Sequence, residues 1–529
     1  MSSLVREPCD ASRVLSRPAS SPCSKSHGRW VLVATTLASS MAFIDSTVVN
    51  VALPALQTQL NASVVDVQWV VEAYSLLLAA LLLVGGSMGD HYGRRRIFLC
   101  GVALFASASA WCGFAADIHQ LIAARAAQGL GAALLVPGSL AIISSSFPES
   151  ERGRAIGTWS GFSAITTAIG PVVGGWLIEH VSWRAVFFLN IPLALAVIFI
   201  SFWRVPESVD EESAGLDWLG AILAALGLGA LVYGLIESSR RGFTDPSVRV
   251  ALVGAMALLV IFIIVEARSS NPMLPLTLFR SRTFAGANLL TLLLYGALGG
   301  TLFFVPLNLI QVQHYSATAA GAALFPFILI IFLLSRWAGG LVEKYGARLP
   351  LVAGPLVAAA GFALFAVPGA GGSYWQNFFP AIATLGMGMA ISVAPLTTSV
   401  MNSVRPNRVG VASGVNNAIA RAAGLLAIAV LGIVMVRAFD HSLDRQLSGA
   451  QLPASERELL QAQSSKLAAI SLPEDLDDAT RHTIERAIDE SFVHSFRIVM
   501  AIGASLALAA GITSLVLIGP VSAKETLGE

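Results

Sequence analysis

Apolar residues dominate this chain in long, regularly interrupted stretches. A stretch of about 18 or more predominantly apolar residues is long enough to cross a bilayer as a helix. Fourteen such stretches occur, at about 30–53, 68–88, 97–115, 119–145, 154–178, 185–203, 217–237, 249–267, 285–308, 318–341, 350–367, 378–400, 411–436 and 497–518. The pattern predicts an all-α membrane protein with fourteen spans.

Composition supports this prediction and excludes several function classes. Of the 529 residues, 55% are hydrophobic and only 12% are charged, against about 25% charged in soluble domains. A net charge of +1 argues against a nucleic-acid partner. The four cysteines form no CxxC pair or Cys/His cluster, so we expect neither a disulfide framework nor a metal site.

Basic residues in the short loops predict the orientation. Lys and Arg follow alternate spans, as in Arg94–Arg96, Arg152 and Arg154, and Lys344 and Arg348, whereas the intervening loops at 54–67, 116–118, 309–317 and 368–377 contain none. Arg240, Arg241 and Arg249 break the pattern on one outer loop. Cytoplasmic loops carry the excess of Lys and Arg. We therefore expect both termini in the cytoplasm and a multi-pass protein of the cytoplasmic membrane.

A faint internal repeat predicts the domain organisation. The turn 89–96 after span two resembles the turn 342–348 after span ten, and the start of span five resembles that of span thirteen. Duplicated six-helix halves are a recurrent transporter plan. The predicted parts are a cytoplasmic tail 1–29, an N-terminal six-helix bundle 30–203, two extra spans 204–267, a C-terminal six-helix bundle 268–518 and a tail 519–529. The hydrophilic outer loop 437–496, within the C-terminal part, either caps the outer face or guides substrate.

Two glycine-rich segments resemble signature motifs of the major facilitator superfamily. Gly85–Arg96, which contains Gly89, Asp90, Gly93 and Arg94, resembles its loop between spans two and three. The resemblance implies a latch that holds the two halves together; a purely topogenic basic loop is the alternative. Gly170, Pro171, Gly174 and Gly175 in span five resemble the antiporter motif, although small residues also pack ordinary membrane helices.

Further motifs resemble the fourteen-span drug:proton antiporters, the group that contains QacA and EmrB. They are Asp45–Pro54 in span one, Trp69–Tyr74 in span two and Trp183–Pro192 in span six. Arg125–Ala133 in span four resembles a further motif of the major facilitator superfamily, whose arginine is tied to proton coupling. The resemblance covers about 30–518 and is most specific in the first six spans. It implies a major facilitator fold of two six-helix bundles plus two additional transmembrane helices.

Three charged residues lie inside predicted spans of the N-terminal half. A charge at the bilayer centre costs at least about 2.5 kcal/mol, and at 1.5 Å per residue Asp45, Arg125 and Glu72 lie roughly 12, 9 and 6 Å deep. We expect Asp45 to be the principal protonation site, near Arg125. Glu72 is a candidate second protonation or cation site. The alternatives are a static Asp45–Arg125 ion pair and, for Glu72, an interfacial acid that reaches water.

The second half offers a mixed aromatic and amide lining that suits bulky amphipathic ligands. The candidate substrate-binding residues are Asn288, Tyr295, Phe303, Phe304, Asn308 and Arg421. Phe side chains in membrane helices also face lipid or pack, and Arg421 could instead bind backbone carbonyls. We see no intramembrane acid in spans nine to fourteen.

The predicted function is export of amphipathic drugs, dyes or antibiotics by exchange for protons through alternating access. The partners would be the small-molecule substrate, protons and the lipid bilayer, with no cofactor because the proton gradient drives transport, and with a monomeric protein. The alternatives are an exporter of an endogenous metabolite, lipid or self-made antibiotic, and a membrane sensor or enzyme. No nucleophile–base constellation or phosphate loop supports an enzyme.

Overall fold

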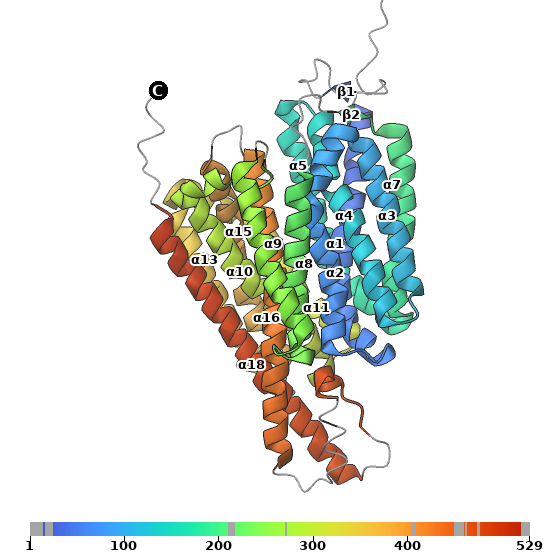
Figure 1. Cartoon of the computed structure of the whole chain (residues 1–529), viewed down its shortest axis with the longest axis vertical. Helices are drawn as coiled ribbons and strands as arrows, with labels where there is room; N and C mark the ends of the chain where they lie inside the picture. The colour runs from blue at the N-terminus through green and yellow to red at the C-terminus, as the bar shows by residue number, and fades with distance from the viewer. Residues whose placement is uncertain are drawn as a thin grey trace, which may run out of the picture. The chain divides into compact units, whose positions relative to one another are not determined.

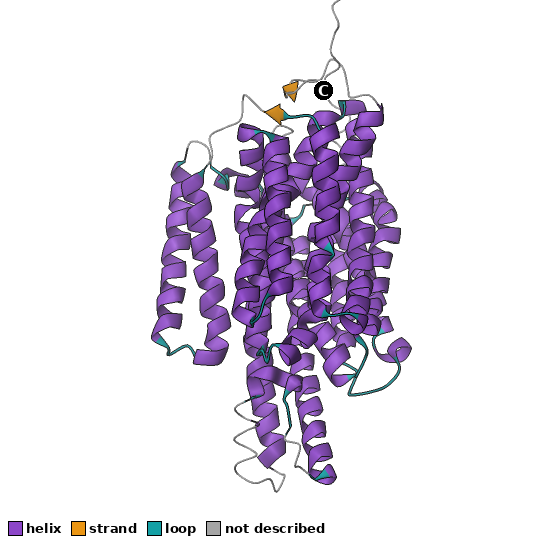
Figure 2. Ribbon diagram, turned by 90° about the vertical axis from the view of Figure 1, so that its right-hand side faces the viewer, coloured by secondary structure: helices purple, strands orange, loops and turns teal. Residues whose placement is uncertain are grey.

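The structure, a computed structural model, is almost entirely helical. It describes residues 14–15, 25–209, 217–269, 272–404, 409–448, 460, 463–472 and 477–519. Most of the predicted tails 1–29 and 519–529, and parts of the predicted outer loop 437–496, therefore lie outside the described residues. The strands β1 (Val14–Leu15) and β2 (Ser208–Val209) pair in parallel, with Val14 opposite Ser208, and Figure 2 shows them beside the helices.

The prediction of fourteen spans is confirmed, since fourteen described helical segments are long and apolar enough to cross a membrane. The chain folds as two compact units. Unit 1 contains Met1–Ala52, Trp69–Gly229 and Gly254–Met273, and unit 2 contains Leu53–Gln68, Ala230–Val253 and Leu274–Glu529. Unit 2 thus includes residues 53–68, which connect the first two spans, and residues 230–253, which connect the seventh and eighth spans.

Unit 1 is built from helices of the first half of the chain. They are α1 (Lys25–Gln59), α2 (Val64–Tyr92), α3 (Arg94–Phe114), α4 (Ile118–Ser146), α5 (Glu149–His180), α6 (Trp183–Phe188) and α7 (Asn190–Arg204), with parts of α8 (Trp218–Arg241) and α9 (Pro246–Arg268).

Small residues bring the helices of unit 1 into close contact. A Cβ added at Gly131 of α4 would lie 2.5 Å from the backbone nitrogen of Phe105 on α3. A Cβ at Gly129 would lie 2.4 Å from the carbonyl oxygen of Tyr74 on α2. Small residues drive helix association in lipid because they let backbones approach. The core of the unit consequently runs along α1, α2, α3, α4 and α7.

The sixth span is one membrane-length segment, Trp183–Arg204, that is interrupted only at Leu189, whose backbone angles remain helical. α6 ends at Phe188 and α7 begins at Asn190. Pro192 follows in the first turn of α7, where its missing N–H costs least. The break places Asn190 at a helix start inside the unit, where it is 1% exposed.

Unit 2 contains the helices of the second half. They are η1 (Leu276–Arg280), α10 (Arg282–Leu307), η2 (Asn308–Val312), α11 (Ala317–Ala323), α12 (Phe325–Tyr345), α13 (Arg348–Phe365), α14 (Tyr374–Asn377), α15 (Phe379–Asn402), α16 (Val409–Ser448), η4 (Ser464–Ala469) and α18 (Asp478–Leu517). Breaks at Leu324 and Phe378 each precede a proline, Pro326 and Pro380. α10 packs on α16 and α18, and α13 packs on α15 and α18.

Two helices of unit 2 are far longer than a bilayer requires. α16 and α18 each have 40 residues, which is roughly 60 Å at 1.5 Å per residue against a hydrocarbon thickness of about 30 Å. Figure 1 shows both running on past the ends of α10 and α13 in the same unit. Together with η4, their ends belong to the described part of the predicted outer loop 437–496.

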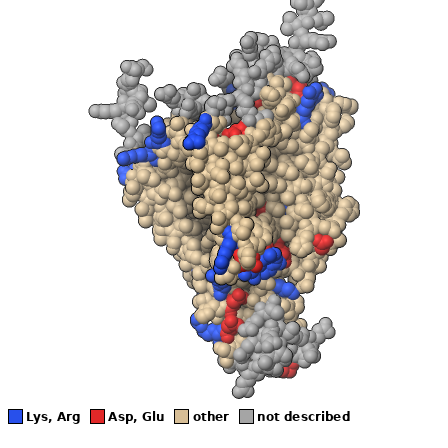
Figure 3. Space-filling model, in the orientation of Figure 1, with Lys and Arg blue, Asp and Glu red and all other residues tan. Residues whose placement is uncertain are grey.

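On the exposed surface in Figure 3, charged side chains are rare along the middle of the helices. On the face shown in Figure 3, Lys and Arg gather near the helix ends, and a broad band between them is almost uncharged. Large apolar side chains are exposed along these helices, such as Phe199 and Phe202 on α7 and Val253 and Met256 on α9. This is the surface expected of helices that face lipid.

Candidate functional site

The centre of unit 1 holds a buried carboxylate, Asp45 of α1, which is 1% exposed. Its Oδ1 accepts hydrogen bonds from the amide nitrogens of Gln128 (2.8 Å) and Asn190 (3.3 Å). Its Oδ2 accepts a hydrogen bond from Nη1 of Arg125, with which it forms an ion pair. Three donors on two other spans therefore surround this carboxylate.

Arg125 of α4 is also buried, and its guanidinium contacts several groups. Its Nη1 donates to Oε1 of Gln128 at 2.7 Å, and its Nε donates to the carbonyl of Val70 on α2 at 3.0 Å. Its guanidinium carbon lies 4.3 Å from the ring centroid of Tyr74. A planar, always charged guanidinium suits such a multidentate site. The arginine thus joins α1, α2 and α4.

Neutral side chains complete the network around this ion pair. Ser109 of α3 accepts hydrogen bonds from Asn190 (3.0 Å) and Gln128 (3.3 Å) and donates to the carbonyl of Phe187 at the end of α6 (2.8 Å). The break between α6 and α7 brings Asn190 and the Phe187 carbonyl to this point. We name Asp45, Arg125, Gln128, Ser109 and Asn190 the carboxylate network.

The network can respond to a proton because it contains both donors and an unused acceptor. Among the described residues, Oδ1 of Asn190 is buried without a hydrogen-bond partner. An ionised carboxylate accepts only, whereas a protonated one also donates. Protonation of Asp45 would weaken its bond to Arg125 and create a donor beside the Asn190 amide. The geometry therefore supports two alternative hydrogen-bond patterns.

Sequence reasoning found the charged pair but missed its neutral partners. Gln128 and Asn190 lie inside motif segments that the sequence singled out, yet neither was assigned a role. A buried carboxylate needs several hydrogen-bond donors. The amides of Gln128, one turn after Arg125, and of Asn190 could therefore have been predicted as partners of Asp45. Ser109 carries no comparable signal, because serine is common in membrane helices.

Glu72 of α2 is fully buried but stands apart from the carboxylate network. Neither of its carboxylate oxygens has a hydrogen-bond partner among the described residues. The nearest link is through the chain, since Val70, two residues earlier, binds Arg125. An ionised carboxylate here would be an uncompensated buried charge. Glu72 therefore stays a predicted proton or cation site with no structural partner.

The turn between α2 and α3 forms a second ionic cluster, with one acid that the sequence did not reveal. Asp90 accepts a hydrogen bond from Nε of Arg94 at 2.7 Å. The carboxylate at the start of α3 is instead Glu207, which accepts from the backbone N–H of Arg95 at 3.0 Å. Gly93 has φ 110°, and a Cβ there would lie 2.8 Å from Glu207. Only glycine fits between this acid and the helix start.

The glycine motif of α5 packs on the helix that carries Asp45. A Cβ at Gly170 would lie 2.5 Å from Oγ1 of Thr47, and one at Gly174 would lie 2.5 Å from Cγ1 of Val48. Pro171 lies inside α5, and Gly175 beside it is buried. The motif thus sets the distance between α5 and the segment of α1 next to Asp45.

The predicted substrate-binding residues of unit 2 lie on α10, in η2 and on α16. Asn288 of α10 is buried and accepts a hydrogen bond from Asn416 of α16 at 3.1 Å, while Asn416 also donates to Thr291 at 2.7 Å. The rings of Phe303 and Phe304 contact each other edge to face and are buried.

The remaining substrate-binding candidates of unit 2 lie in η2, on α10 and on α16. Asn308 lies in η2 and accepts from Gln313 at 3.3 Å. Tyr295 is half-buried on α10, and Arg421 is half-buried on α16. A substrate role for these residues stays a prediction. Across the described part of the chain, no group of three or more His, Cys, Asp or Glu side chains could hold a metal ion.

Comparison with known proteins places this architecture in a family. Multidrug resistance protein Stp of Mycobacterium tuberculosis (strain CDC 1551 / Oshkosh) is 36% identical over 435 residues, 81% of this chain and 80% of that protein. The tetracenomycin C resistance and export protein of Streptomyces glaucescens is 32% identical over 508 residues, 94% of this chain and 93% of that protein.

Solved structures agree on the fold. A bacterial homologue of the human lysosomal transporter Spinster, in an inward-facing and unoccupied conformation, superposes with a TM-score of 0.64 at 17% identity, covering 93% of this chain and 98% of that chain. The sequence profile described as "Major Facilitator Superfamily" matches residues 35–428. With its fourteen spans, its helical fold and these relatives, the chain belongs to the Major Facilitator Superfamily, a family of transporters that move small molecules across membranes rather than of enzymes.

Proposed function

We propose that this transporter exports amphipathic drugs or antibiotics in exchange for protons, and that Asp45 carries the proton. The observation that supports this proposal most is the carboxylate network. It keeps an ionisable acid at 1% exposure in the membrane-spanning part of unit 1, with a guanidinium and two amides around it. Intramembrane acids of this kind mark proton relays.

The proposed proton step is a change of partners. A proton from the outer side neutralises Asp45, and Arg125 then keeps its bonds to Gln128 and Val70. Loss of the ion pair frees α1 to shift against α4, so the protonated and ionised forms favour different conformations. The membrane potential contributes about 2.3 kcal/mol per charge per 100 mV to inward proton movement. The gradient drives the cycle, so no cofactor is needed.

Further residues have proposed roles in the same cycle. Gly89, Asp90, Gly93 and Arg94 form the conformational latch, together with Glu207, and Gly170, Pro171, Gly174 and Gly175 let α5 move against α1. Glu72 is a second candidate proton site. Asn288, Tyr295, Phe303, Phe304, Asn308 and Arg421 are the proposed substrate contacts.

The names of the relatives support a drug or antibiotic as substrate. They include a multidrug resistance protein and a protein of both tetracenomycin C resistance and export. The second name, and that of a cephamycin export protein of Amycolatopsis lactamdurans that is 34% identical, favour a second candidate function. In that case the chain exports an antibiotic or metabolite that its own cell makes.

The proposed setting is the cytoplasmic membrane, with a monomer whose two termini are cytoplasmic. An even number of spans supports termini on one side. The basic residues Arg94–Arg96, Arg152 and Arg154 in the loops after spans two and four support the cytoplasmic side.

Transport by purified protein in proteoliposomes tests the proposal. A pH gradient, acidic on the face that is extracellular in cells, should drive substrate movement to that face, and a protonophore should abolish it. The substrate panel should include planar aromatic antibiotics, cationic dyes and β-lactams. Uptake that is unaffected by the protonophore would contradict proton coupling, and no movement of any panel member would contradict drug export.

A further inference from the structure

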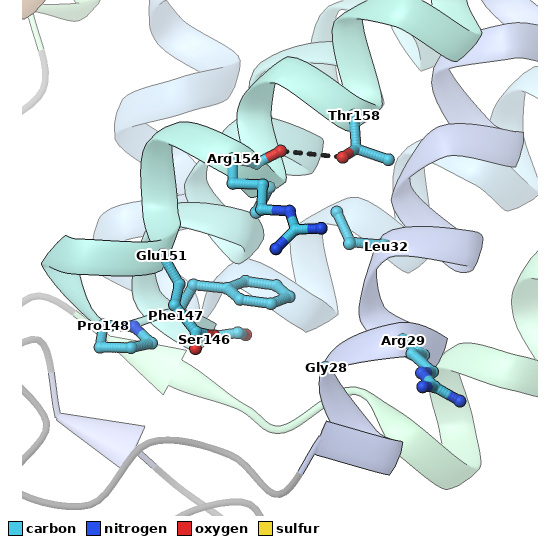
Figure 4. A pocket seen from close by; sticks show the side chains of 10 residues that line it. Gly28, Arg29, Leu32, Ser146, Phe147, Pro148, Glu151, Arg154 and Thr158 are labelled. Carbon is cyan, nitrogen blue, oxygen red and sulfur yellow. Dashed lines mark hydrogen bonds between the residues drawn. The ribbon is translucent and has the colours of Figure 1, made fainter.

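A cavity of about 380 Å³ opens at one end of unit 1, away from the carboxylate network. Residues from the start of α1, the end of α4 and the start of α5 line it, among them Arg29, Ser146, Glu151 and Arg154. Figure 4 shows the Arg154 side chain reaching into the space between Leu32 and Phe147. Ligand sites are commonly about 300–1,000 Å³, so the cavity can hold a small group.

Two arginines at this cavity have no acidic partner. Among the described residues, neither Arg29 nor Arg154 forms a side-chain hydrogen bond or an ion pair. Glu151 lines the same cavity, but within the described chain it is not within ion-pair distance of either guanidinium. Among the described side chains that line the cavity, two unpaired guanidiniums against one carboxylate leave a net positive charge. The cavity therefore favours an anion.

The start of α5 adds donors to the same place. Its N-cap residue is Pro148, whose side chain forms no capping hydrogen bond. The first N–H groups of a helix have no partner within the helix and attract anions. The helix that begins here has 32 residues, so its full macrodipole acts at this end.

A buried hydroxyl without a partner points independently to a ligand. Ser146, the last residue of α4, lines the cavity and is only 6% exposed. Its Oγ has no hydrogen-bond partner among the described residues. Buried hydroxyls are normally satisfied, and a rotation about χ1 would let this one donate to a phosphate oxygen. Arg, hydroxyl and helix N–H groups are together the usual donors to phosphate.

The walls of the cavity indicate how the phosphate is presented. Leu32 and Phe147 provide an apolar wall, and Trp30, next to Arg29, is 44% exposed. Exposed tryptophans are typical of the membrane–water interface. Basic pockets between membrane helices at the cytoplasmic side bind anionic lipid headgroups. With the proposed orientation, this cavity lies at that side.

We infer that this cavity binds a phosphate group, presented by the headgroup of an anionic phospholipid of the cytoplasmic leaflet. The inference is separate from proton coupling and uses only the proposed orientation. Arg154, which reaches into the cavity (Figure 4), holds the phosphate oxygens, and Arg29 adds positive charge at the edge of the cavity. The Ser146 hydroxyl and the start of α5 donate to the phosphate, and the glycerol moiety lies against Leu32 and Phe147.

Binding of short-chain lipids to the detergent-purified full chain tests this inference. Dihexanoyl phosphatidylglycerol should raise the melting temperature, and dihexanoyl phosphatidylcholine, which has no net charge, should not. The Arg29→Gln/Arg154→Gln variant should bind phosphatidylglycerol at least about tenfold more weakly, because each charge-assisted hydrogen bond contributes about a factor of ten. Arg154→Lys, which keeps the charge, should bind with intermediate affinity.

Arg204→Gln is the matched control, because Arg204 is an exposed arginine in the last turn of α7, in the same unit, and does not line the cavity. It should bind as the wild type does. Equal weakening in this control, or equal stabilisation by phosphatidylcholine, would overturn the inference. Full stabilisation by inorganic phosphate with none by phosphatidylglycerol would overturn the lipid source. Substrate transport by the variants is not the readout, so failure of the proposed function would not affect this test.

Discussion

The two units solve the problem of polar groups inside a membrane in different ways. Unit 1 buries an ion pair, Asp45 with Arg125, and surrounds it with amides and a hydroxyl. In unit 2, the described bonds that link α10 to α16 join neutral groups, from Asn416 to Asn288 and Thr291. A charged network can change with protonation, whereas a neutral amide network cannot. The difference suggests that unit 1 carries the ion-coupled step.

The largest expected effect comes from breaking the ion pair of unit 1. Arg125→Gln should lower the free energy of unfolding by about 3–5 kcal/mol, because it leaves the Asp45 charge buried without its partner. Thermal unfolding in detergent measures this loss. The double variant Asp45→Asn/Arg125→Gln should recover most of the stability but no proton transport. An Arg125→Gln protein as stable as the wild type would mean that Asp45 is neutral in the resting protein.

The glycine contact beside Asp45 should give the next largest effect. Gly174→Ala places a Cβ 2.5 Å from Cγ1 of Val48, and such overpacking costs about 1–3 kcal/mol. Transport should fall as well, because α5 and α1 are forced apart. Gly157→Ala is the matched control, since a Cβ there meets nothing within 4 Å. Equal transport by both variants would remove the proposed role of this motif.

The neutral link of unit 2 should be less sensitive than the ion pair. Asn416→Ala removes two hydrogen bonds and leaves the buried Asn288 and Thr291 oxygens with fewer partners. A cost of about 1–3 kcal/mol is expected, with the coupling of protons to substrate unchanged. Proton-to-substrate ratios in proteoliposomes check the second part. A changed ratio would show that unit 2 also takes part in coupling.

The smallest stability effect is expected at the start of α3. Glu207→Gln keeps the size of the side chain but removes the charge that accepts from Arg95 N–H and lies 3.7 Å from Arg96. Removing a helix N-terminal charge costs about 0.3–1 kcal/mol. If Glu207 belongs to the latch, transport should fall by more than this small loss explains. If transport falls only as far as the loss of stability explains, Glu207 is a structural cap of α3 and not part of the latch.

The spans and the charged pair could be predicted from the sequence because both follow from the free-energy cost of placing polar or charged groups in lipid. Apolar stretches of this length form membrane helices. An acid and a base buried inside such helices are expected to form an ion pair, as Asp45 and Arg125 do. The one-residue interruptions at Leu189 and Leu324, shortly before Pro192 and Pro326, were not predicted, because apolar composition continues through them. Asn190 and Glu207 were missed because their importance depends on partners 145 and 112 residues away.

The most direct test compares Asp45→Asn with wild type in proteoliposomes that contain a pH-sensitive dye. Adding substrate to wild-type vesicles should move protons, and Asp45→Asn should abolish this proton flux while still binding substrate. Asn416→Ala, altered in the neutral link of unit 2, should keep the flux. Substrate-driven proton movement by Asp45→Asn at the wild-type rate would contradict the assignment of Asp45 as the proton carrier.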